Sequence, residues 1–411
     1  MRALRGVFVL LVLTLAAVAC GSDAGGQTGP AGRPGGNEAA GSLASATVKP
    51  DDLCKTEYGN VKAPQGLRVG LVTDLGQVDD GTFNQFAFEG MKAAERCFNI
   101  KTSFIETTSQ ADYARNLDEA LRERPDVVIT VGFLLGTDTL RFAQTHPETK
   151  FIGVDQLQER YPSNYVGVLF REDESGFIAG AMAGLLTRSG AVAVIGGRQD
   201  VPSVVRFVNG FAQGAKYVNP SIDVRHVYTD SFTDQAKGVS AAKQFLGEGA
   251  DVIFGAGGQT GSGGIKAAAA DGAWVIGVDQ DEYFTTFSKG KAPGADRLAT
   301  SAMKRVDLGV FTEIAKAVTG QFTSGAFVGD AGNGGVTYAP FHDAKIPGDV
   351  AKRVEEVRKG LADGSIETGI DPATGQIVNQ LFILGFTAVR RSGGLSSAIP
   401  RRRPPVFRHT V

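Results

Sequence analysis

Two aspartates occupy the same position in two copies of a short repeat. The residues Gly-Val-Asp-Gln occur at 153–156 and again at 277–280, and each copy ends an apolar run that is typical of a buried strand. An aspartate at the carboxyl end of a buried parallel strand lies where open α/β sheets bind their ligands. The carboxylate is a strong hydrogen-bond acceptor. The repeat therefore predicts two similar lobes, with Asp155 in one and Asp279 in the other, that face one small molecule.

Two further segments match each other, and one of them lies about one βα unit upstream of each copy of the repeat. Asp-Val-Val-Ile at 126–129 leads to a glycine turn, and Asp-Val-Ile-Phe at 251–254 leads to a glycine-rich stretch. Elsewhere strands alternate with helices, which indicates parallel βαβ units with right-handed crossovers. The expected strands are 67–74, 102–106, 126–131, 150–155, 191–196, 223–228, 251–254 and 274–279, and the expected helices are 84–98, 111–124, 138–145, 175–186, 204–218, 235–248, 264–270 and 307–319.

Three further extended segments connect these two sets of units. We interpret 165–170 as the crossing into the second lobe, 298–302 as the crossing back and 335–339 as a third crossing. The sequence therefore predicts an α/β clamshell of two doubly wound parallel-sheet lobes joined by three crossover segments. The assigned ranges are 66–168 plus 299–334 for the N-terminal lobe and 169–298 plus 335–385 for the C-terminal lobe.

The N-terminus indicates export. Arg2 and Arg5 precede an apolar stretch at 7–19 that is too short to span a bilayer comfortably. The four residues that end in Cys20 resemble a bacterial lipobox, so we predict a lipoprotein signal peptide over 1–20 and lipidation of Cys20. The alternative is ordinary signal cleavage near residue 19 with an incidental cysteine.

The segments that flank the lobes differ from them in composition. Residues 21–65 begin rich in Gly, Ala, Ser and Pro and are predicted to be a flexible tether and lead-in. Residues 386–411 are basic and lack periodicity, which indicates a disordered tail. Cys54 and Cys97 remain as a pair in an oxidising compartment, where they either form a disulfide or stay separate buried thiols.

Several function classes are excluded by what the sequence contains. The net charge of −2 creates no global field that would attract nucleic acid. The four histidines share no metal-ligand spacing, and the glycine-rich stretch at 255–261 fits neither a dinucleotide fingerprint nor a phosphate loop. No nucleophile elbow has a credible histidine partner. We therefore expect no enzyme, no metal and no cofactor.

Six motifs together resemble the basic membrane protein family of bacterial lipoproteins. The likeness runs in order from about 67 to 339, and its motifs lie at 71–85, 202–211, 228–234, 257–261, 277–281 and 300–305. The resemblance implies a type I periplasmic-binding fold and a solute-binding protein of an ABC importer. It also implies a nucleoside ligand, purine above all, permease and ATPase partners, and lipid anchoring to the bacterial cell membrane. We expect a monomer that binds no nucleic acid.

A ribose with several hydroxyl donors would suit the polar candidates at the strand ends. Asp279 is the first candidate, because an ionised carboxylate can accept two ribose hydroxyls at once; a helix-cap or turn role is its alternative. Lys304 lies just past the returning strand and could donate to ribose or base, unless it is a solvated lysine. Asp155 is expected to face the hinge rather than to contact ligand.

A flat base would suit the aromatic candidates. Phe83 and Phe232 follow strand ends in opposite lobes and could sandwich a base, since base–aromatic stacking contributes about 1–3 kcal/mol per base. Phe232 lies in a polar loop, where core packing is a weaker explanation. Phe207 and Phe211 are four apart on a helix, so core packing is their better interpretation.

The first strand–helix turn and a glycine pair complete the candidate set. Asp74 and Asn84 are suited to reading base-edge nitrogens, although Asn84 also fits a helix N-cap. One carboxylate of the pair 79–80 is interpreted as a cap of the same helix. Gly257 and Gly258 let backbone approach a ligand closely, or serve only a tight turn.

Other binding functions remain open at this level. A sugar or another small molecule could replace the nucleoside, and a sensor lipoprotein could use the same fold for signalling. An intracellular repressor core is disfavoured, because it would need a helix-turn-helix in front of the clamshell instead of a signal and tether.

Overall fold

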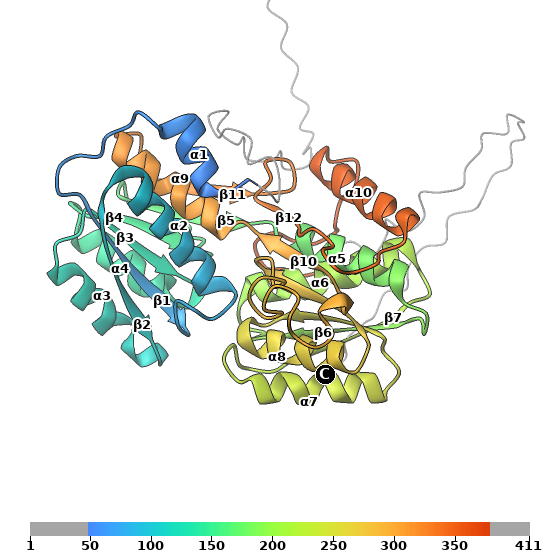
Figure 1. Ribbon diagram of the computed structural model, residues 1–411. Helices are drawn as coiled ribbons and strands as arrows, with labels where there is room; N and C mark the ends of the chain where they lie inside the picture. The colour runs from blue at the N-terminus through green and yellow to red at the C-terminus, as the bar shows by residue number, and fades with distance from the viewer. Residues whose placement is uncertain (1–47, 379–411) are drawn as a thin grey trace, which may run out of the picture. The chain divides into compact units, whose positions relative to one another are not determined.

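The computed structural model describes residues 48–378 (Figure 1). The predicted signal peptide, the lipobox with Cys20, most of the tether and the basic tail lie outside these residues. The described chain contains two six-stranded sheets, each covered by helices on both faces. This confirms the predicted α/β class with two mostly parallel sheets.

The first sheet has the strand order β11-β5-β4-β3-β1-β2, and all its pairings are parallel. Its core lies on both faces, because successive residues of one strand point to opposite sides. Leu71 packs with the helices α2 and α9, whereas the next residue, Val72, packs with α3 and α4. The strands are β1 Arg68–Leu75, β2 Lys101–Thr107, β3 Val127–Val131, β4 Lys150–Val154, β5 Tyr165–Phe170 and β11 Gly325–Gly329, and the helices are α2 Phe83–Phe98, α3 Tyr113–Arg122, α4 Gly136–Thr145 and α9 Val306–Thr319.

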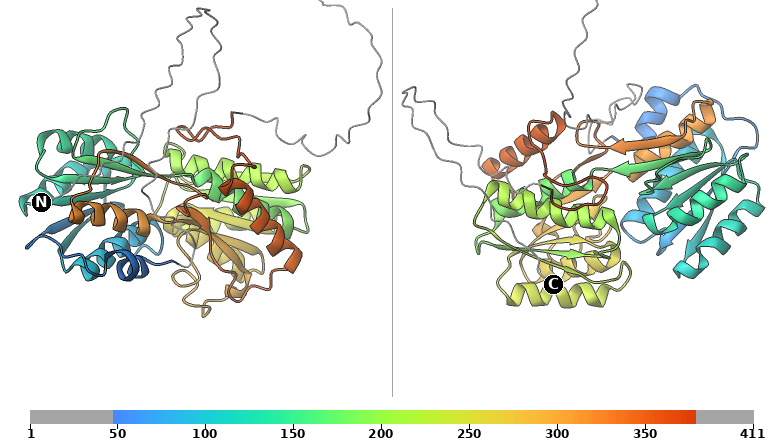
Figure 2. Two further views of the ribbon diagram at one scale, coloured as in Figure 1. Left: turned by 90° about the horizontal axis from the view of Figure 1, so that it is seen from above. Right: turned by 180° about the vertical axis from the view of Figure 1, so that it is seen from behind.

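The second sheet has the order β12-β10-β9-β8-β6-β7, and only β12 is antiparallel to its neighbour. Val194 packs toward α5 and α6, and Ile195 packs toward α7 and α8. Helix α10 lies beside α5 (Figure 2). The strands are β6 Ala191–Gly196, β7 Asp223–Tyr228, β8 Val252–Ala256, β9 Trp274–Asp279, β10 Leu298–Lys304 and β12 Val336–Tyr338, and the helices are α5 Glu172–Leu186, α6 Pro202–Val218, α7 Gln235–Gly247, α8 Gly258–Ala270 and α10 Gly348–Ala362.

The strands form where the sequence has short continuous apolar runs. β3 reads Val-Val-Ile-Thr-Val and is buried at every position, as a strand covered on both faces must be. Five short elements add to these: α1 Pro50–Leu53, η1 Cys54–Tyr58, η2 Gln110–Asp112, η3 Phe133–Leu135 and η4 Ala295–Arg297. The carboxyl ends of the parallel strands in each sheet lie along one edge, so polar loop residues gather there.

One predicted domain boundary is wrong. We expected residues 298–302 to cross back and residues from 299 to join the N-terminal lobe. Instead β10 pairs in parallel with β9 from Leu298 to Met303 and belongs to the second sheet. The alternation of its small and apolar residues completes the buried face of that sheet, and the crossing follows Lys304. The segment 165–170, predicted to cross into the second lobe, is instead strand β5 of the first sheet, and the crossing follows Phe170. The third crossing lies between β11 and β12.

The lead-in before β1 is tied to the first sheet's outer helix. Cys54 and Cys97 form a disulfide bond with a Cα–Cα distance of 5.7 Å. Tyr58 packs edge-on against Phe98 and Phe311, so the start of the described chain covers α2 and α9. Within residues 48–378, no helix is both long and apolar enough to cross a bilayer.

Candidate functional site

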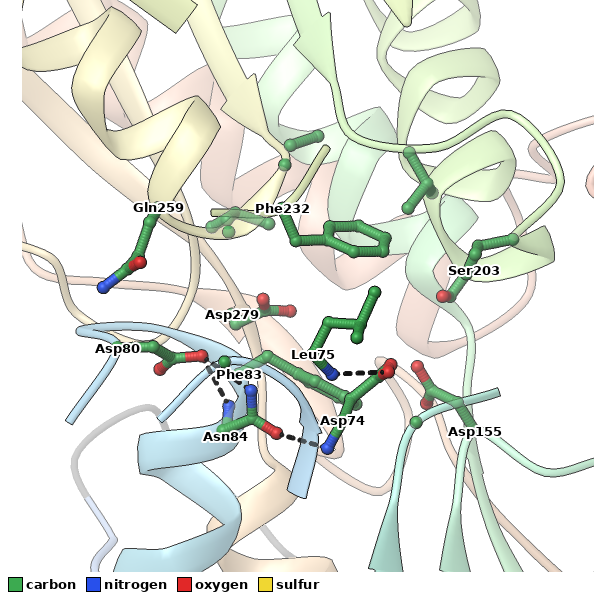
Figure 3. A pocket seen from close by; sticks show the side chains of 18 of the residues that line it. Asp74, Leu75, Asp80, Phe83, Asn84, Asp155, Ser203, Phe232, Gln259 and Asp279 are labelled. Atoms are coloured by element: carbon green, nitrogen blue, oxygen red, sulfur yellow. Dashed lines mark hydrogen bonds between the residues drawn. The ribbon is translucent and has the colours of Figure 1, made fainter. Parts of the chain in front are cut away.

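One cavity lies where the strand ends of the two sheets meet. Figure 3 shows Phe232 above this space and Phe83 below it, with the Asp279 carboxylate between them. All eight residues that the sequence analysis named as ligand candidates line it. They are Asp74, Phe83, Asn84, Phe232, Gly257, Gly258, Asp279 and Lys304.

Asp279 and Asp155 reach the cavity from equivalent strand ends. Both have a left-handed backbone, with φ of 64° and 62°, which turns each carboxylate at the last residue of the apolar run. The carboxylate of Asp279 makes no hydrogen bond with the described part of the chain. Oδ1 of Asp155 is buried and likewise has no partner within residues 48–378. Both side chains therefore hold acceptor capacity for a ligand.

Lys304 supplies the ammonium group of this cavity. Its Nζ lies 2.5 Å from Oδ2 of Asp155 and 2.9 Å from Oε1 of Glu172. It also lies 4.7 Å from the centre of the Phe83 ring. Burial disfavours the ammonium, but the carboxylates of Asp155 and Glu172 prevail and raise the pKa of Lys304 above its ordinary value. Lys304 is 1% exposed, so its alternative as a solvated lysine is wrong.

Asp74, the last residue but one of β1, supplies a further acceptor. Its Oδ1 accepts hydrogen bonds from the Tyr113 hydroxyl and from the Leu75 N–H. A Cβ at Gly132 would lie 2.1 Å from Oδ2 of Asp74, so this carboxylate needs a glycine beneath it. Burial raises the pKa of Asp74 to about 6, although both hydrogen bonds lower it.

Asn84 holds the turn that carries Asp74. Its Oδ1 accepts from the Asp74 N–H at 3.0 Å, and its Nδ2 donates to Asp80 at 3.1 Å. Asn84 is the second residue of α2 and not its cap. Asp80 satisfies that helix terminus instead, because its carboxylate accepts from the N–H groups of Thr82, Asn84 and Gln85. The predicted capping role of one carboxylate in this pair is confirmed for Asp80.

The electrostatic balance of the cavity is acidic. Among the described residues that line it, four are carboxylates, Asp74, Asp80, Asp155 and Asp279, and only Lys304 is cationic. Burial raises the pKa of Asp279 to about 7, against the lowering effect of the Lys304 ammonium. The site is therefore built for a ligand that donates hydrogen bonds and carries no negative charge.

The two aromatic rings are seated differently. Phe83 is the first residue of α2 and is half-buried. Phe232 lies in the loop between β7 and α7, where its ring rests on Gly197: a Cβ there would lie 2.4 Å from the ring. Its carbonyl accepts from the Thr260 N–H at 3.1 Å, which ties the loop to α8. The Phe232 ring is thus backed by protein on one side and borders the cavity.

Gly257 and Gly258 both need the absence of a side chain. A Cβ at Gly257 would lie 2.9 Å from the Gly197 nitrogen, and Gly258 has a φ of 55°. Gly258 therefore needs glycine for its backbone conformation and Gly257 for its close approach to Gly197, and both line the cavity.

Sequence reasoning underrated five residues that line the same cavity. Asp155 was expected to face the hinge, although the repeat itself marked it as the twin of Asp279. Phe207 packs in the core, as predicted, and also borders the cavity. Phe133, Ser203 and Gln259 carried no spacing or motif that distinguished them from ordinary loop and helix-start residues.

The chain matches a protein-family model described as ABC transporter substrate-binding protein PnrA-like, over residues 67–336. It is 32% identical to the ABC transporter nucleoside-binding protein BmpA of Lactococcus lactis, over 74% of this chain and 90% of that protein. It is 30% identical to the CD4+ T-cell-stimulating antigen of Listeria monocytogenes, over 76% of this chain and 90% of that protein.

Solved structures agree on the fold. An ABC transporter solute-binding protein from Aeropyrum pernix superposes with a TM-score of 0.65 at 25% identity, over 73% of this chain and 92% of that one. An ABC transporter solute-binding protein from Conexibacter woesei has a TM-score of 0.58 at 23% identity, over 74% of this chain and 98% of that one. The second likeness concerns the type I fold alone.

Proposed function

The chain belongs to the family of PnrA-like ABC transporter substrate-binding proteins, and we propose that its cavity binds a nucleoside, purine nucleosides foremost, for delivery to an ABC permease. Proteins of this family are ligand binders and not enzymes. The observation that carries the proposal is the position of Asp279. Its carboxylate has no hydrogen-bond partner in the described chain and borders the same cavity as Phe83 and Phe232.

The ribose is assigned to the acidic end of the cavity. Asp279 accepts from two ribose hydroxyls, and the unpartnered Oδ1 of Asp155 accepts from another polar hydrogen. Lys304 donates a hydrogen bond to Asp155 and forms an ion pair with Glu172 at 2.9 Å, so at least one of its three N–H groups is left for the ligand. Charge-assisted hydrogen bonds in a closed site are strong, so this end supplies much of the affinity.

The base is assigned to the aromatic rings. Phe83 and Phe232 come from the two lobes, and a base between them gains stacking on both faces. Asp74 and Asn84 lie at the rim of this space and read base-edge nitrogens, with the remaining N–H of the Asn84 amide as a donor.

The acidic lining supports a nucleoside over a nucleotide. A phosphate would enter a cavity with four carboxylates and one ammonium group, and like charges in a desolvated site repel strongly. Phosphorylated ligands should therefore bind far more weakly than the parent nucleoside.

The N-terminus fits the same role. Lipidation of Cys20, which lies outside the described residues, would hold the binder as a monomer at the outer face of the cell membrane, close to its permease. A lipoprotein that senses the ligand for signalling would use the same cavity, and neighbouring genes for a permease and an ATPase would favour transport.

A thermal-shift screen of the chain without residues 1–20 tests the proposal. Nucleosides, free bases, pentoses and nucleoside monophosphates are added at equal concentrations. A ligand at 100 times its dissociation constant stabilises the protein by about 2.7 kcal/mol. We expect the nucleosides to raise the melting temperature and the monophosphates to leave it nearly unchanged. If every nucleoside leaves it unchanged while a sugar raises it, the nucleoside assignment is wrong.

A further inference from the structure

A chain of buried charges runs behind the cavity, away from the ligand space. Glu172 is the first residue of α5, is fully buried and does not line the cavity. Its Oε1 lies 2.9 Å from Nζ of Lys304, which in turn pairs with Asp155. Glu172 therefore contacts a cavity residue without being able to contact a ligand itself.

Arg206 forms the next link. It is buried on α6, and its Nε lies 2.5 Å from Oε2 of Glu172. The four groups Asp155, Lys304, Glu172 and Arg206 thus alternate in charge. Burial alone would raise the pKa of Glu172, but Arg206 and Lys304 lower it to about 2. The carboxylate is ionised because both cations face it, so removal of either cation shifts it toward the other.

A hairpin at the end of the described chain covers the outer link. Residues 369–378, here called the C-terminal hairpin, are joined by a bridge between Ile370 and Ile377. The Pro372 carbonyl accepts from Nη1 of Arg206 at 2.9 Å. Gly375 has a φ of 76°, and a Cβ there would lie 2.9 Å from the backbone nitrogen of Arg206. The hairpin therefore fits closely against Arg206.

We propose that Glu172 and Arg206 are positioning residues, which together with the C-terminal hairpin hold the Lys304 ammonium between Asp155 and Glu172 and so set the affinity for the ligand. The assignment of Lys304 to the ribose rests on the proposed function, whereas the ion pairs of Lys304 and Arg206 are observed in the structure. The hairpin does not line the cavity, and besides Arg206 it contacts Pro202, Val205 and Asn209 of the same helix.

The mechanism predicts opposite effects for the two links. Without the Glu172 charge, Lys304 loses one of the carboxylates that hold its proton, and its amine becomes more reactive. Without the Arg206 charge, Glu172 has Lys304 as its remaining cation and draws it away from Asp155, so the amine becomes less reactive. General loosening of the core would instead raise the reactivity in both cases.

The experiment compares Glu172→Gln and Arg206→Met with the ligand-free wild-type chain. The acylation rate of Lys304 by acetic anhydride is followed by mass spectrometry and divided by the rate at the exposed Lys359. Glu172→Gln should raise this ratio at least tenfold, since one pKa unit changes the free-amine fraction tenfold. Arg206→Met should lower it at least twofold. The matched control is Glu313→Gln, a buried glutamate on α9 that pairs with Lys316 and lies outside the cavity.

A second arm measures the hairpin and the ligand. Gly375→Val should shift the Lys304 ratio in the same direction as Arg206→Met, whereas Gly272→Val, with a φ of 90° and open space around it, should not. Calorimetry with a ribonucleoside should show at least a tenfold weaker affinity for Glu172→Gln and Gly375→Val. In the same two variants, the affinity for the 2′,3′-dideoxy analogue of this nucleoside should fall less than threefold.

The outcomes separate the two proposals. If Glu172→Gln and Arg206→Met change the Lys304 ratio in the same direction, or if both match Glu313→Gln, the positioning role is wrong. If Arg206→Met does not fold, the Lys304 acylation ratio of Gly375→Val alone tests the role of Arg206 and the C-terminal hairpin. If the wild-type chain binds no nucleoside, the proposed function is wrong, and the acylation ratios still decide the positioning role.

Discussion

Asp155, just after β4, and Asp279, the last residue of the equivalent strand β9, have nearly the same left-handed backbone, at φ of 62° and 64°. A residue other than glycine held in such a conformation costs about 1–3 kcal/mol and persists where the surrounding structure enforces it. Aspartate tolerates it better than most residues. The duplicated turn thus directs one carboxylate from each lobe into a single cavity. Both copies of the repeat have the strained backbone at this aspartate.

Asp279→Ala should remove most of the nucleoside affinity. The ribose hydroxyls lose a charged acceptor, which costs about 1.5–3 kcal/mol, or roughly 10- to 150-fold in the dissociation constant. Calorimetry checks this, with the exposed Asp296→Ala as the control. The affinity for deoxyribonucleosides should differ less between the wild-type chain and Asp279→Ala than the affinity for ribonucleosides does. Wild-type affinity in Asp279→Ala would remove this residue from the site.

Asp279→Asn should stabilise the ligand-free protein at neutral pH. The folded pKa of Asp279 is about 7, above that of an unfolded aspartate. Between about pH 4 and 7 the folded state binds more protons, so the free energy of unfolding falls as pH rises through this window. The amide carries no such penalty, so the gain should be present at pH 8 and absent below about pH 4.

Thermal unfolding of wild type and Asp279→Asn from pH 4 to 8 measures this difference. Asp296→Asn, which changes an exposed aspartate, controls for net charge. Parallel curves for wild type and Asp279→Asn over the whole range would show that the Asp279 carboxylate is not destabilised by burial.

Much of this fold follows from local patterns. The βαβ alternation and the repeat predicted both sheets, because each buried strand is a continuous apolar run between glycine turns. β10 could not be placed, since Leu-Ala-Thr-Ser-Ala-Met-Lys reads equally well as a connecting segment. Its pairing with β9 depends on a neighbour in space. Helix α8 begins at Gly258 and not near 264 as expected, because its glycines pack closely on Gly238 and Gly255.

The cavity shows the same division. Asp279, Lys304 and both phenylalanines were predicted, because polar or aromatic residues at strand ends stand out against apolar runs. The partners behind them were not. Glu172 and Arg206 lie on helices, where a charged residue normally indicates a solvated face. Only the tertiary structure shows that both are buried and paired.

Phe232→Ala should weaken nucleosides far more than free ribose. The ring offers stacking to a base, worth about 1–3 kcal/mol, and offers nothing comparable to a sugar. Competition binding with a nucleoside and with ribose measures the ratio. Phe284→Ala, which truncates an exposed ring on another loop, should leave both affinities unchanged. Equal weakening of both ligands by Phe232→Ala would mean that this ring supports the loop and does not stack on a base.

Ligand binding should draw the two lobes together. Nε2 of Gln280 donates to the Thr82 carbonyl at 3.1 Å, and Oγ1 of Thr285 donates to the Gly81 carbonyl at 2.9 Å, so a second-lobe loop holds the start of α2. A ligand that touches both lobes selectively stabilises the closed arrangement. Small-angle scattering should therefore show a smaller radius of gyration with a nucleoside than without it.

Gln280→Ala tests which contact sets that balance. Loss of one hydrogen bond of about 1 kcal/mol should lower the closed population and weaken apparent affinity roughly fivefold, without touching the ligand. The exposed Gln244→Ala is the control. An unchanged radius of gyration on saturation would contradict closure, and unchanged affinity in Gln280→Ala would show that the bond to Thr82 does not contribute to it. A variant that binds more weakly yet still contracts fully on saturation would establish that Gln280 shifts the equilibrium between the lobes and leaves the closed state itself intact.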